Sequence, residues 1–495
     1  MICVSIGRTR HKMVVAEHKH LAGKGAKLVE LRLDWLRRRP DVARLIKDRP
    51  TPVVITCRTT DDRGRWRGTE DQRLAILREA IVSGVEYVDL EGEIAGKIPR
   101  YGDTKRIVSY HNFDETPLHL PDILEKLSQK DPDIVKIVTM ANAPSDNVRM
   151  LEVVQSAKVP VVGFCMGELG IPSRLLCGKY GSPFTYASFS KERELAPGQL
   201  SYAETRALYG FNKIDGDTKV FGLLGDPVAH SHSPLVHNAA FRKQKLNAVY
   251  IPFRVPPELL SDTLQEFDRL GIHGYSVTIP HKEEALAKGT PDDGARDIGA
   301  ANTLFKDDGF WKSTNTDYSA ALEALQAVLD EQDDESGRTL EGRRVLILGA
   351  GGVARAVGLA LVRKGSAVVI ANRGRDRGQN LASELGCQYI NWENRGSEHA
   401  EVVINCTSVG MHPKVDETPY DEHWMRDGAI AFDTVYTPEN TLFLKNAAAR
   451  GCATVSGLDM FVRQAAHQFK IFTGQEPPIE YMRDTLRRGL SAARR

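Results

Sequence analysis

The sequence has almost no net charge, no paired-cysteine motif and no long apolar run. Its 495 residues include 66 Lys and Arg against 65 Asp and Glu, a formal net charge of +1, so no global field favours nucleic acid or a membrane surface. The seven cysteines are dispersed and form no CxxC pair, which argues for reduced thiols and against a zinc site. No apolar run is long enough to span a bilayer, and the first residues show no secretory or transit pattern. We therefore expect a cytoplasmic protein that binds neither nucleic acid nor membrane and needs no metal.

What is present is the composition of a globular protein, with 41% hydrophobic and 26% charged residues. A chain of this length exceeds one ordinary core, so we expect roughly two to four domains. The polar, glycine-bearing stretch FNKIDGDTKV marks a boundary near Asp215. We place the first domain at 1–214, the second at 219–322 with C-terminal helices at about 460–495, and the third at 323–459.

Short β-branched runs alternate with helix-like segments in the first domain. Residues 69–84 are typical of these segments, with Thr69 as an N-cap candidate and a glycine at the end. Strands that alternate with helices form right-handed βαβ units and a parallel sheet. Eight of them in about 210 residues predict an α/β fold of the (β/α)8 barrel type, with an open doubly wound sheet as the alternative. The expected strands cover residues 2–7, 28–34, 53–58, 87–91, 106–113, 134–140, 161–167 and 184–189.

Polar side chains fall near the C-terminal ends of these strands, where barrel enzymes carry their chemistry. Any one of them alone would be read as a solvated charge or a structural salt bridge. Together, however, they indicate an active site, because acids, a histidine, a lysine and several arginines all converge on one end of the barrel. These residues are Ser5, Glu30, Arg32, Asp34, Arg58, Glu91, His111, Lys136 and Arg174.

Lys136 lies in the middle of the apolar run DIVKIVTM. A buried ammonium is costly, so this lysine either snorkels to solvent from a strand edge or is a desolvated amine that can attack a carbonyl. In the second case it forms an imine with a ketone, and the imine acidifies the adjacent carbon. His111 would then shuttle the proton, with Glu91 to orient it. Arg58 and Arg174 would hold a substrate carboxylate through paired donors.

The segments ELRLD, SYHNFDETP, DIVKIVTM, MGELGIPSR and APGQLS resemble the type I 3-dehydroquinate dehydratases, and the likeness covers nearly the whole first domain. The resemblance implies that Lys136 is the Schiff-base lysine and that His111 and Glu91 are its proton-transfer pair. The family usually has a serine where this chain has Leu195, and the loop 189–195 is longer here. The substrate-binding residues that the resemblance implies are Ser5, Glu30, Arg32, Arg58, Arg174 and Gln199.

The second half contains a further set of polar motifs. Ser231 and Ser233 precede a helix that begins near Pro234, either as N-caps or as hydroxyls that receive a carboxylate. Lys282 follows a strand, and Asp317 lies further along in TNTD. A lysine and an aspartate that meet in a cleft form a proton-relay pair at a hydroxyl or a ketone.

An apolar strand then runs into a glycine-rich turn and a helix. Such a turn lets a pyrophosphate approach the backbone and the helix N-terminus. At the end of the next strand, where an NAD enzyme carries an acidic residue, this chain has Asn372 and Arg373, with Arg375 and Arg377 close by. Arginines there favour the 2′-phosphate of NADP. The turn and the helix start comprise Gly349, Ala350, Gly351, Gly352 and Val353.

The motifs HSHSP, TIPHK, GAANT, TNTD, GAGGVARA, NCTSVGM and GLDMFVRQAAHQF resemble the shikimate dehydrogenases and occur in that family's order. The resemblance implies Lys282 and Asp317 as the catalytic pair, a substrate-binding domain at 219–322 and a Rossmann NADP domain at 323–459. The substrate residues that it implies are Ser231, Ser233, Thr278, Asn302, Tyr436 and Gln464. It adds Thr407, Gly457 and Met460 to the cofactor site.

The two halves resemble consecutive enzymes of one pathway, in the order of the plant-type fused enzymes, and Ser276 in GYSVTIPHK favours the same type. The expected activities are dehydration of 3-dehydroquinate to 3-dehydroshikimate and NADPH-dependent reduction of that ketone to shikimate, by a monomer or dimer. Three alternatives stay open: a quinate/shikimate dehydrogenase of relaxed specificity in the second half, a class I aldolase in the first, and a non-catalytic quinate-sensing regulator. The regulator would lack the catalytic residues and carry a DNA-binding segment.

Overall fold

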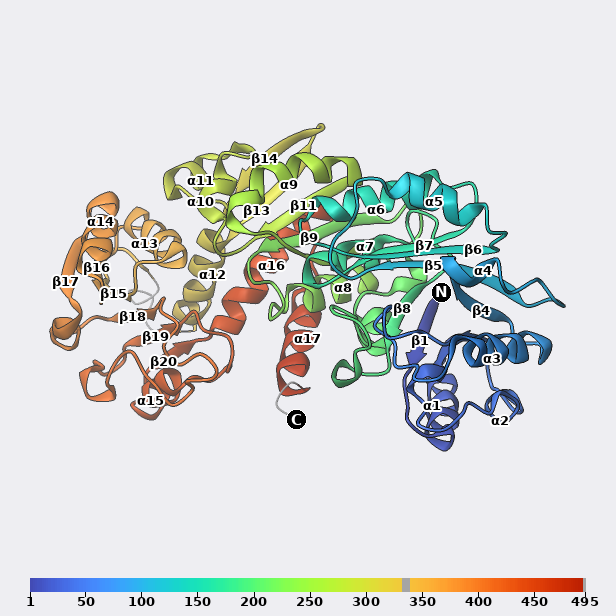
Figure 1. Ribbon diagram of the computed structural model, residues 1–495. Helices are drawn as coiled ribbons and strands as arrows, with labels where there is room; N and C mark the ends of the chain where they lie inside the picture. The colour runs from blue at the N-terminus through green and yellow to red at the C-terminus, as the bar shows by residue number, and fades with distance from the viewer. Residues whose placement is uncertain (332–338, 493–495) are drawn as a thin grey trace. The chain divides into compact units, whose positions relative to one another are not determined.

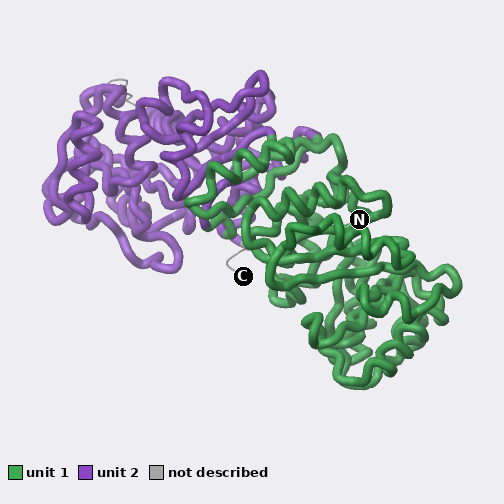
Figure 2. The backbone as a smooth tube through the Cα atoms, turned by 45° about the horizontal axis from the view of Figure 1, so that its top comes forward, with its two compact units in different colours: residues 1–222, 227–229, 247–272 green, residues 223–226, 230–246, 273–495 purple. Residues whose placement is uncertain are grey.

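The computed structural model describes residues 1–331 and 339–492 and divides into two compact units (Figure 2). Unit 1 comprises residues 1–222, 227–229 and 247–272, and unit 2 comprises residues 223–226, 230–246 and 273–495. Within the described ranges, no helix is long and apolar enough to cross a membrane. The same residues hold no group of three or more His, Cys, Asp or Glu side chains placed to bind a metal ion.

Parallel strands alternate with helices through the first part of unit 1 (Figure 1). They pair in the order β7-β6-β5-β4-β3-β2-β1-β8, so the barrel is nearly closed and the predicted (β/α)8 fold is confirmed. The strands are β1 (Ile2–Ile6), β2 (Leu28–Arg32), β3 (Val53–Thr56), β4 (Tyr87–Glu91), β5 (Lys105–Asn112), β6 (Ile134–Met140), β7 (Val161–Met166) and β8 (Thr185–Ser188). The helices are α1 (His11–Gly23), α2 (Val42–Ile46), α3 (Glu70–Val82), α4 (Gly92–Ala95), α5 (Leu120–Ser128), α6 (Ser145–Ser156) and α7 (Ile171–Leu176).

Helix α3 shows how the local sequence sets the helix limits. Thr69 Oγ1 accepts a hydrogen bond from Gln72 N, and Gln72 Oε1 accepts one from Thr69 N, which makes a capping box. Gly84, at φ +72°, follows the last turn. The helix predicted at 69–84 is therefore confirmed. After β8, a short π-helical stretch, Glu204–Leu208, ends the barrel segment.

The barrel interior changes from apolar to polar along the strands. Its N-terminal part is filled by a buried cluster that includes Cys3, Leu28, Val54, Ile107, Ile134 and Val162. Two residues further along, the strand register places Ser5 beside Glu30 and Ser109 beside Lys136. The core thus supports a polar mouth at the C-terminal ends of the strands, as barrel architecture requires.

The second sheet is mixed and pairs in the order β10-β9-β11-β13-β14-β12. β11 and β14 both run antiparallel to β13, which lies between them. The strands are β9 (Lys219–Gly225), β10 (Ala248–Arg254), β11 (Ile272–Val277), β12 (Thr290–Pro291), β13 (Thr303–Asp307) and β14 (Phe310–Thr314). The accompanying helices are α8 (Ser233–Lys243), α9 (Leu260–Phe267), α10 (Lys282–Leu286) and α11 (Asp293–Ile298).

The third sheet is parallel and pairs in the order β17-β16-β15-β18-β19-β20, which is the 3-2-1-4-5-6 order of dinucleotide-binding folds. Helices α12 and α13 cover its apolar side chains, and α12 also packs on α16. The strands are β15 (Arg344–Leu348), β16 (Ala367–Asn372), β17 (Gln388–Asn391), β18 (Val402–Asn405), β19 (Ile430–Asp433) and β20 (Ala453–Val455). The helices are α12 (Thr316–Asp330), α13 (Gly352–Arg363), α14 (Arg375–Leu385), α15 (Leu442–Ala449), α16 (Gly457–Thr473) and α17 (Ile479–Ala492).

Candidate active sites

Lys136 lies inside the barrel, with its side chain only 6% exposed. Its Nζ is 3.0 Å from Asp89 Oδ2 and 3.8 Å from Glu30 Oε1. The face of the Tyr186 ring lies 4.1 Å from the same nitrogen. The strand-edge interpretation of this lysine is therefore wrong: the amine is desolvated, and two carboxylates and a ring face surround it.

His111, at the end of β5, lies beside Asp62, and their Nδ1 and Oδ2 atoms are 3.3 Å apart. Burial and the nearby Arg58 cation lower the pKa of His111 to about 4, and Asp62 opposes them only in part. The imidazole is therefore neutral near pH 7 and able to accept a proton. Burial would raise the pKa of Asp62, but His111 and Arg58 outweigh it and hold that pKa below its usual range.

Glu91, which the sequence analysis pairs with His111, has different partners. Arg73 of α3 donates to Glu91 Oε2 at 2.7 Å, and Arg58 lies 3.8 Å from its Oε1. Burial raises the pKa of Glu91. Within the described part of the chain no ion pair joins Glu91 to His111, so the carboxylate that orients the histidine is Asp62, from the loop after β3. Glu91 instead neutralises a buried arginine.

Arg58 and Asp89 form a buried network next to Lys136. Asp89 Oδ2 accepts from Arg58 at 2.8 Å and from Lys136 at 3.0 Å, and its Oδ1 accepts from Ser109 at 2.6 Å. Arg58 also donates to Asp62 at 2.5 Å, which links the lysine and histidine regions. Asp89 is not among the predicted site residues, although its i, i+2 spacing from Glu91 places both side chains on one face of β4.

The remaining residues expected to bind substrate in the barrel differ in how many of their polar atoms already form hydrogen bonds within the protein. Arg32 is held by Asp34 through two hydrogen bonds of 2.9 Å. Gln199 Oε1 accepts from the backbone of Leu195 at 2.9 Å. Arg174 is 2% exposed, and its Nε and one terminal nitrogen have no hydrogen-bond partner among the described residues. Burial lowers the pKa of Arg174 to about 10. Such a guanidinium has donors to spare for an anion.

Glu30 and Ser5 complete the polar mouth of the barrel. Thr56 Oγ1 donates to Glu30 Oε1 at 2.8 Å. Burial would raise the pKa of Glu30, but Lys136 and Arg32 outweigh it and lower that pKa. A hydrogen bond from Ser5 acts in the same direction. Glu30 is thus held as a carboxylate beside the amine.

The predicted pair in unit 2 is in contact, because Lys282 Nζ donates to Asp317 Oδ2 at 2.6 Å. Lys282 is the first residue of α10, and Asp317 lies in the first turn of α12. Asn315 fixes that turn, because its side chain accepts from Asp317 N at 3.0 Å. The side chain of Lys282 is 17% exposed, and that of Asp317 is 9% exposed. The arrangement can hold and pass a proton at a carbonyl oxygen.

The hydroxyls expected to bind substrate are not helix caps. His232 is the N-cap residue of α8, and the hydroxyl of Ser231 accepts from Ser233 N at 3.2 Å. The hydroxyl of Ser231 also donates to that of Ser233 at 3.2 Å. Neither serine is therefore the N-cap residue of α8, although Ser231 accepts from the first N–H of that helix. Tyr436 stands near this loop, with its ring 6.1 Å from that of His232.

Asn302 and Thr278 lie at the ends of neighbouring strands, and Gln464 is half-buried on α16. Thr278 N donates to Leu224 O at 2.9 Å, and Asn302 Nδ2 donates to Thr316 Oγ1 at 2.9 Å. Gln468, one helical turn beyond Gln464, escaped the sequence analysis.

The side chain of Gln468 ties α16 to the substrate strands. It accepts from Ser276 Oγ at 2.6 Å and donates to Asn302 O at 3.1 Å. The i, i+4 spacing from Gln464 places Gln468 on the same face of the helix, and this spacing could have indicated it from the sequence.

The glycine-rich turn has the shape that a pyrophosphate needs. Gly349 has φ +112°, and a Cβ there would lie 2.9 Å from Cys406 O. Within the described residues, α13 begins without a side-chain cap, so its first N–H groups point out of the helix end. A Cβ on Gly352 would lie 3.9 Å from Lys282 Cδ, which places the turn beside the Lys282–Asp317 pair. The residues present fit a dinucleotide.

Other expected cofactor residues surround this turn. Thr407 is held by the side chain of Asn405, which accepts from its N and Oγ1 at 3.0 and 2.7 Å. Gly457 begins α16, where a Cβ would lie 2.5 Å from Val435 O, and Met460 belongs to the buried core.

The end of β16 carries no carboxylate. Asn372 Nδ2 turns back onto Gly374 O at 2.8 Å, and Arg373, Arg375 and Arg377 are exposed. This positive edge matches a 2′-phosphate.

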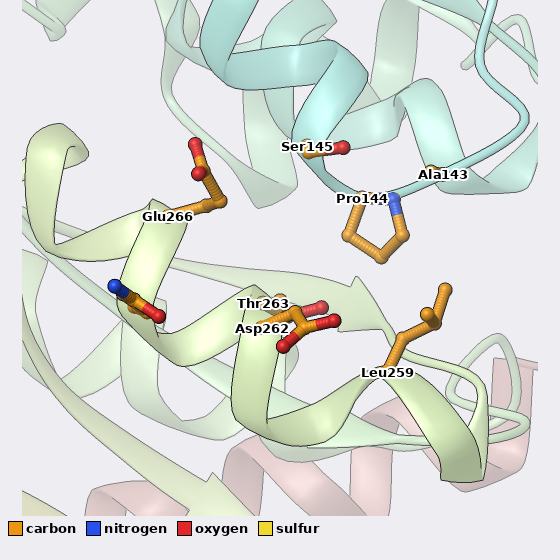
Figure 3. Close-up of a pocket in the computed structure, with 8 residues that line it drawn as sticks. Ala143, Pro144, Ser145, Leu259, Asp262, Thr263 and Glu266 are labelled. Carbon is orange, nitrogen blue, oxygen red and sulfur yellow. The ribbon is translucent and has the colours of Figure 1, made fainter.

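The cavity in Figure 3 lies elsewhere in unit 1, between the start of α6 and α9. None of the expected site residues lines it. Its lining residues are Ala143, Pro144, Ser145, Leu259, Asp262, Thr263, Gln265 and Glu266.

A buried lysine inside a (β/α)8 barrel is typical of a lyase that acts on a carbonyl compound. A Lys–Asp pair beside a dinucleotide turn is typical of a nicotinamide-dependent dehydrogenase. The chain thus combines both classes of enzyme. Family models agree with this division. The type I 3-dehydroquinase model matches residues 2–215, and the shikimate dehydrogenase substrate-binding model matches 223–304. The shikimate/quinate 5-dehydrogenase model matches 331–418, and the shikimate 5′-dehydrogenase C-terminal model matches 457–487.

Whole-chain similarity is equally direct. A bifunctional 3-dehydroquinate dehydratase/shikimate dehydrogenase, chloroplastic, of Arabidopsis thaliana is 38% identical over 502 aligned residues, covering 97% of this chain and 83% of that protein. A shikimate dehydrogenase (NADP+) of Caldanaerobacter subterraneus subsp. tengcongensis is 39% identical over 53% of this chain and 94% of its own. A crystal structure of a shikimate dehydrogenase in complex with NADP+ has a TM-score of 0.52 and 36% identity, covering 56% of this chain and 96% of that one.

The chain belongs to the family of bifunctional 3-dehydroquinate dehydratase/shikimate dehydrogenases. The two activities predicted from the sequence, and NADP as the cofactor, are confirmed by these relatives.

Proposed function

We propose that the two sites act in sequence, the barrel on 3-dehydroquinate and unit 2 on the 3-dehydroshikimate that the barrel produces. The observation that carries the proposal is that each of the two units contains one lysine in surroundings suited to carbonyl chemistry. Lys136 is desolvated inside a barrel, and Lys282 contacts Asp317 beside a dinucleotide turn. These surroundings support the chemistry that we assign to each lysine, and the product of the first reaction is the ketone that the second needs.

In the dehydration, Lys136 attacks the substrate ketone and forms an iminium while water leaves. The iminium withdraws electrons, so the neutral His111 removes a proton from the adjacent carbon. Asp62 stabilises the imidazolium that results, and His111 then returns the proton to the hydroxyl that departs as water. Hydrolysis of the iminium releases the product and restores the lysine.

Substrate binding in the barrel uses the spare donors at the mouth. Arg174 takes the substrate carboxylate, because its buried guanidinium has two nitrogens without a partner in the described residues. Arg58 contributes positive charge at the same mouth, although Asp62 and Asp89 already accept from it. Ser5, Arg32 and Gln199 complete the set.

In the reduction, NADPH supplies a hydride when bound. Lys282 holds a proton at the carbonyl oxygen, and Asp317 keeps its ammonium in place through their 2.6 Å hydrogen bond. Ser231 and Ser233 receive the substrate carboxylate. The arginines after β16 receive the 2′-phosphate.

The first test is the absorbance of NADPH in one cuvette with the protein and 3-dehydroquinate. Oxidation supports both sites acting in sequence, because unit 2 has no ketone until the barrel makes one. A response only after 3-dehydroshikimate is added would contradict the role of Lys136. Steady oxidation of shikimate and quinate with equal efficiency would favour a dehydrogenase of relaxed specificity.

We also propose a cytoplasmic location and a monomer or dimer. The near balance of positive and negative residues supports a protein that is not held at a charged membrane surface. The Arabidopsis relative is described as chloroplastic. Fluorescence of a fusion with the full-length protein in its own cells tests the location. Light scattering of the purified chain tests the oligomeric state.

A further inference from the structure

The interior of the barrel departs from the usual apolar filling at the level of Lys136. In (β/α)8 barrels, alternate strands contribute the side chains of one interior layer, and these are mostly bulky aliphatic residues. Here Glu30 of β2, Asp89 of β4 and Tyr186 of β8 all meet Lys136 of β6. Two carboxylates and the negative face of a ring each favour positive charge on the lysine nitrogen.

Asp89 is the neighbour that is closest to the lysine nitrogen and most fully hydrogen-bonded. Its side chain is fully buried, and each oxygen is committed: Oδ1 to Ser109, and Oδ2 to Arg58 and Lys136. Burial would raise the pKa of Asp89, but Arg58 and Lys136 outweigh it and hold that pKa well below its usual range. Asp89 therefore stays a carboxylate and does not take the lysine proton.

We propose that Asp89 is a further catalytic residue of the dehydration, which fixes Lys136 Nζ and stabilises the positive charge on that nitrogen from ammonium to iminium. The proposal rests on the proposed role of Lys136. In the step concerned, the C–N bond forms and the C–O bond of the ketone breaks. The oxygen leaves as water with two of the three ammonium protons. One of these protons leaves the nitrogen before it attacks, because only the neutral amine has a free electron pair. The nitrogen carries a charge of +1 as the ammonium and again as the iminium, so a fixed anion 3.0 Å away stabilises it at both ends of the step.

The pH dependence of this site involves every group around Lys136. Asp89 interacts with the protonated form of His111, so removal of its charge should move the acid limb of kcat/KM for dehydration to lower pH. The charged and titratable groups that face the lysine from the surrounding strands and loops are Cys3, Glu30, Arg58, Asp89, His111 and Tyr186.

The test compares Asp89→Asn with the full-length wild-type protein. We expect a loss of about 10- to 100-fold in kcat for dehydration, the magnitude of one lost charge-assisted hydrogen bond. We also expect a smaller fraction of protein trapped as the reduced imine by borohydride, measured by mass spectrometry, and an acid limb at lower pH. Reduction of added 3-dehydroshikimate by the same chain reports the amount of active protein.

Asp146→Asn is the matched control. Asp146 is also a buried carboxylate of the same unit, but it caps the loop before α6, where it accepts from Asn142 N and Ala143 N. Its loss should lower the stability of unit 1 and leave the acid limb in place.

Three results would overturn the proposal. One is an Asp89→Asn variant with kcat within threefold of wild type. Another is a lower kcat with unchanged trapping and an unchanged acid limb, which is the pattern of a merely structural residue. If Asp89→Asn does not fold, Asp89→Glu keeps the charge and moves the carboxylate, and wild-type kcat in that variant would refute the fixing role. Failure to trap any imine in the wild-type protein would instead refute the proposed role of Lys136.

Discussion

Replacement of Asp62 by asparagine tests which carboxylate serves His111. Coulomb's law at an effective dielectric constant of about 20 gives about 5 kcal/mol for unit charges separated by the 3.3 Å between them. The side chain of Asp62 is 18% exposed, so water screens part of this energy. The range for a hydrogen bond to a charged group, about 1.5–3 kcal/mol, is therefore the better guide. Asp62→Asn should lower kcat for dehydration by about 10- to 150-fold.

The assay follows the conjugated enone of 3-dehydroshikimate by ultraviolet absorbance. Each variant is also given 3-dehydroshikimate and NADPH, because reduction in unit 2 should be unaffected and normalises the enzyme concentration. Glu91→Gln is the companion variant. It removes a partner of Arg73, so it should lower the free energy of unfolding of unit 1, and kcat should change less than in Asp62→Asn.

The opposite ranking would refute this reasoning. If Glu91→Gln lowered kcat by 10-fold or more while Asp62→Asn stayed within threefold, the carboxylate of Glu91 would have to reach His111 during turnover. The 3.3 Å contact with Asp62 would then have no catalytic meaning.

Three further predictions concern the cofactor edge, the second lysine and acid stability. Changing Arg373 and Arg377 to serine should raise KM for NADPH and leave KM for NADH nearly unchanged in steady-state assays. Lys282→Met should reduce the rate of ketone reduction by about 10²- to 10⁴-fold while dehydration continues, so enone absorbance should accumulate. The pKa of His111 is about 4 in the folded protein against 6.5 as its ordinary value, so the unfolded chain binds more protons between these pH values. Unit 1 should therefore lose about 3 kcal/mol of stability as pH falls from 6.5 to 4, and urea titrations of wild type and His111→Gln should differ in this window.

The fold could be predicted because its signals are local. Each barrel strand is a short β-branched run, and α3 carries its own start and stop signals in Thr69 and Gly84. The dinucleotide turn is equally local, since Gly349 needs positive φ where the chain passes Cys406.

The site was harder to predict, because its contacts depend on loop paths and on depth within the barrel. Asp62 lies in an irregular loop, where no periodicity indicates which of two adjacent aspartates turns inward. Asp89 lies one layer below the strand ends, a level that barrel architecture normally fills with apolar side chains. Glu91, at the expected strand end, was predicted as the partner of His111, but it meets an arginine from α3.

The proposed role of Arg174 as the carboxylate-binding residue would couple the stability of the protein to the supply of its substrate. A buried guanidinium with two nitrogens that find no partner in the described residues lowers the stability of the free barrel. A carboxylate that supplies the missing acceptors restores it, and a ligand at a hundred times its Kd adds about 2.7 kcal/mol to the folded state. We therefore expect the unliganded protein to be cleared by proteases faster when the pathway upstream is idle. In that case the amount of the enzyme would rise and fall with the supply of its substrate.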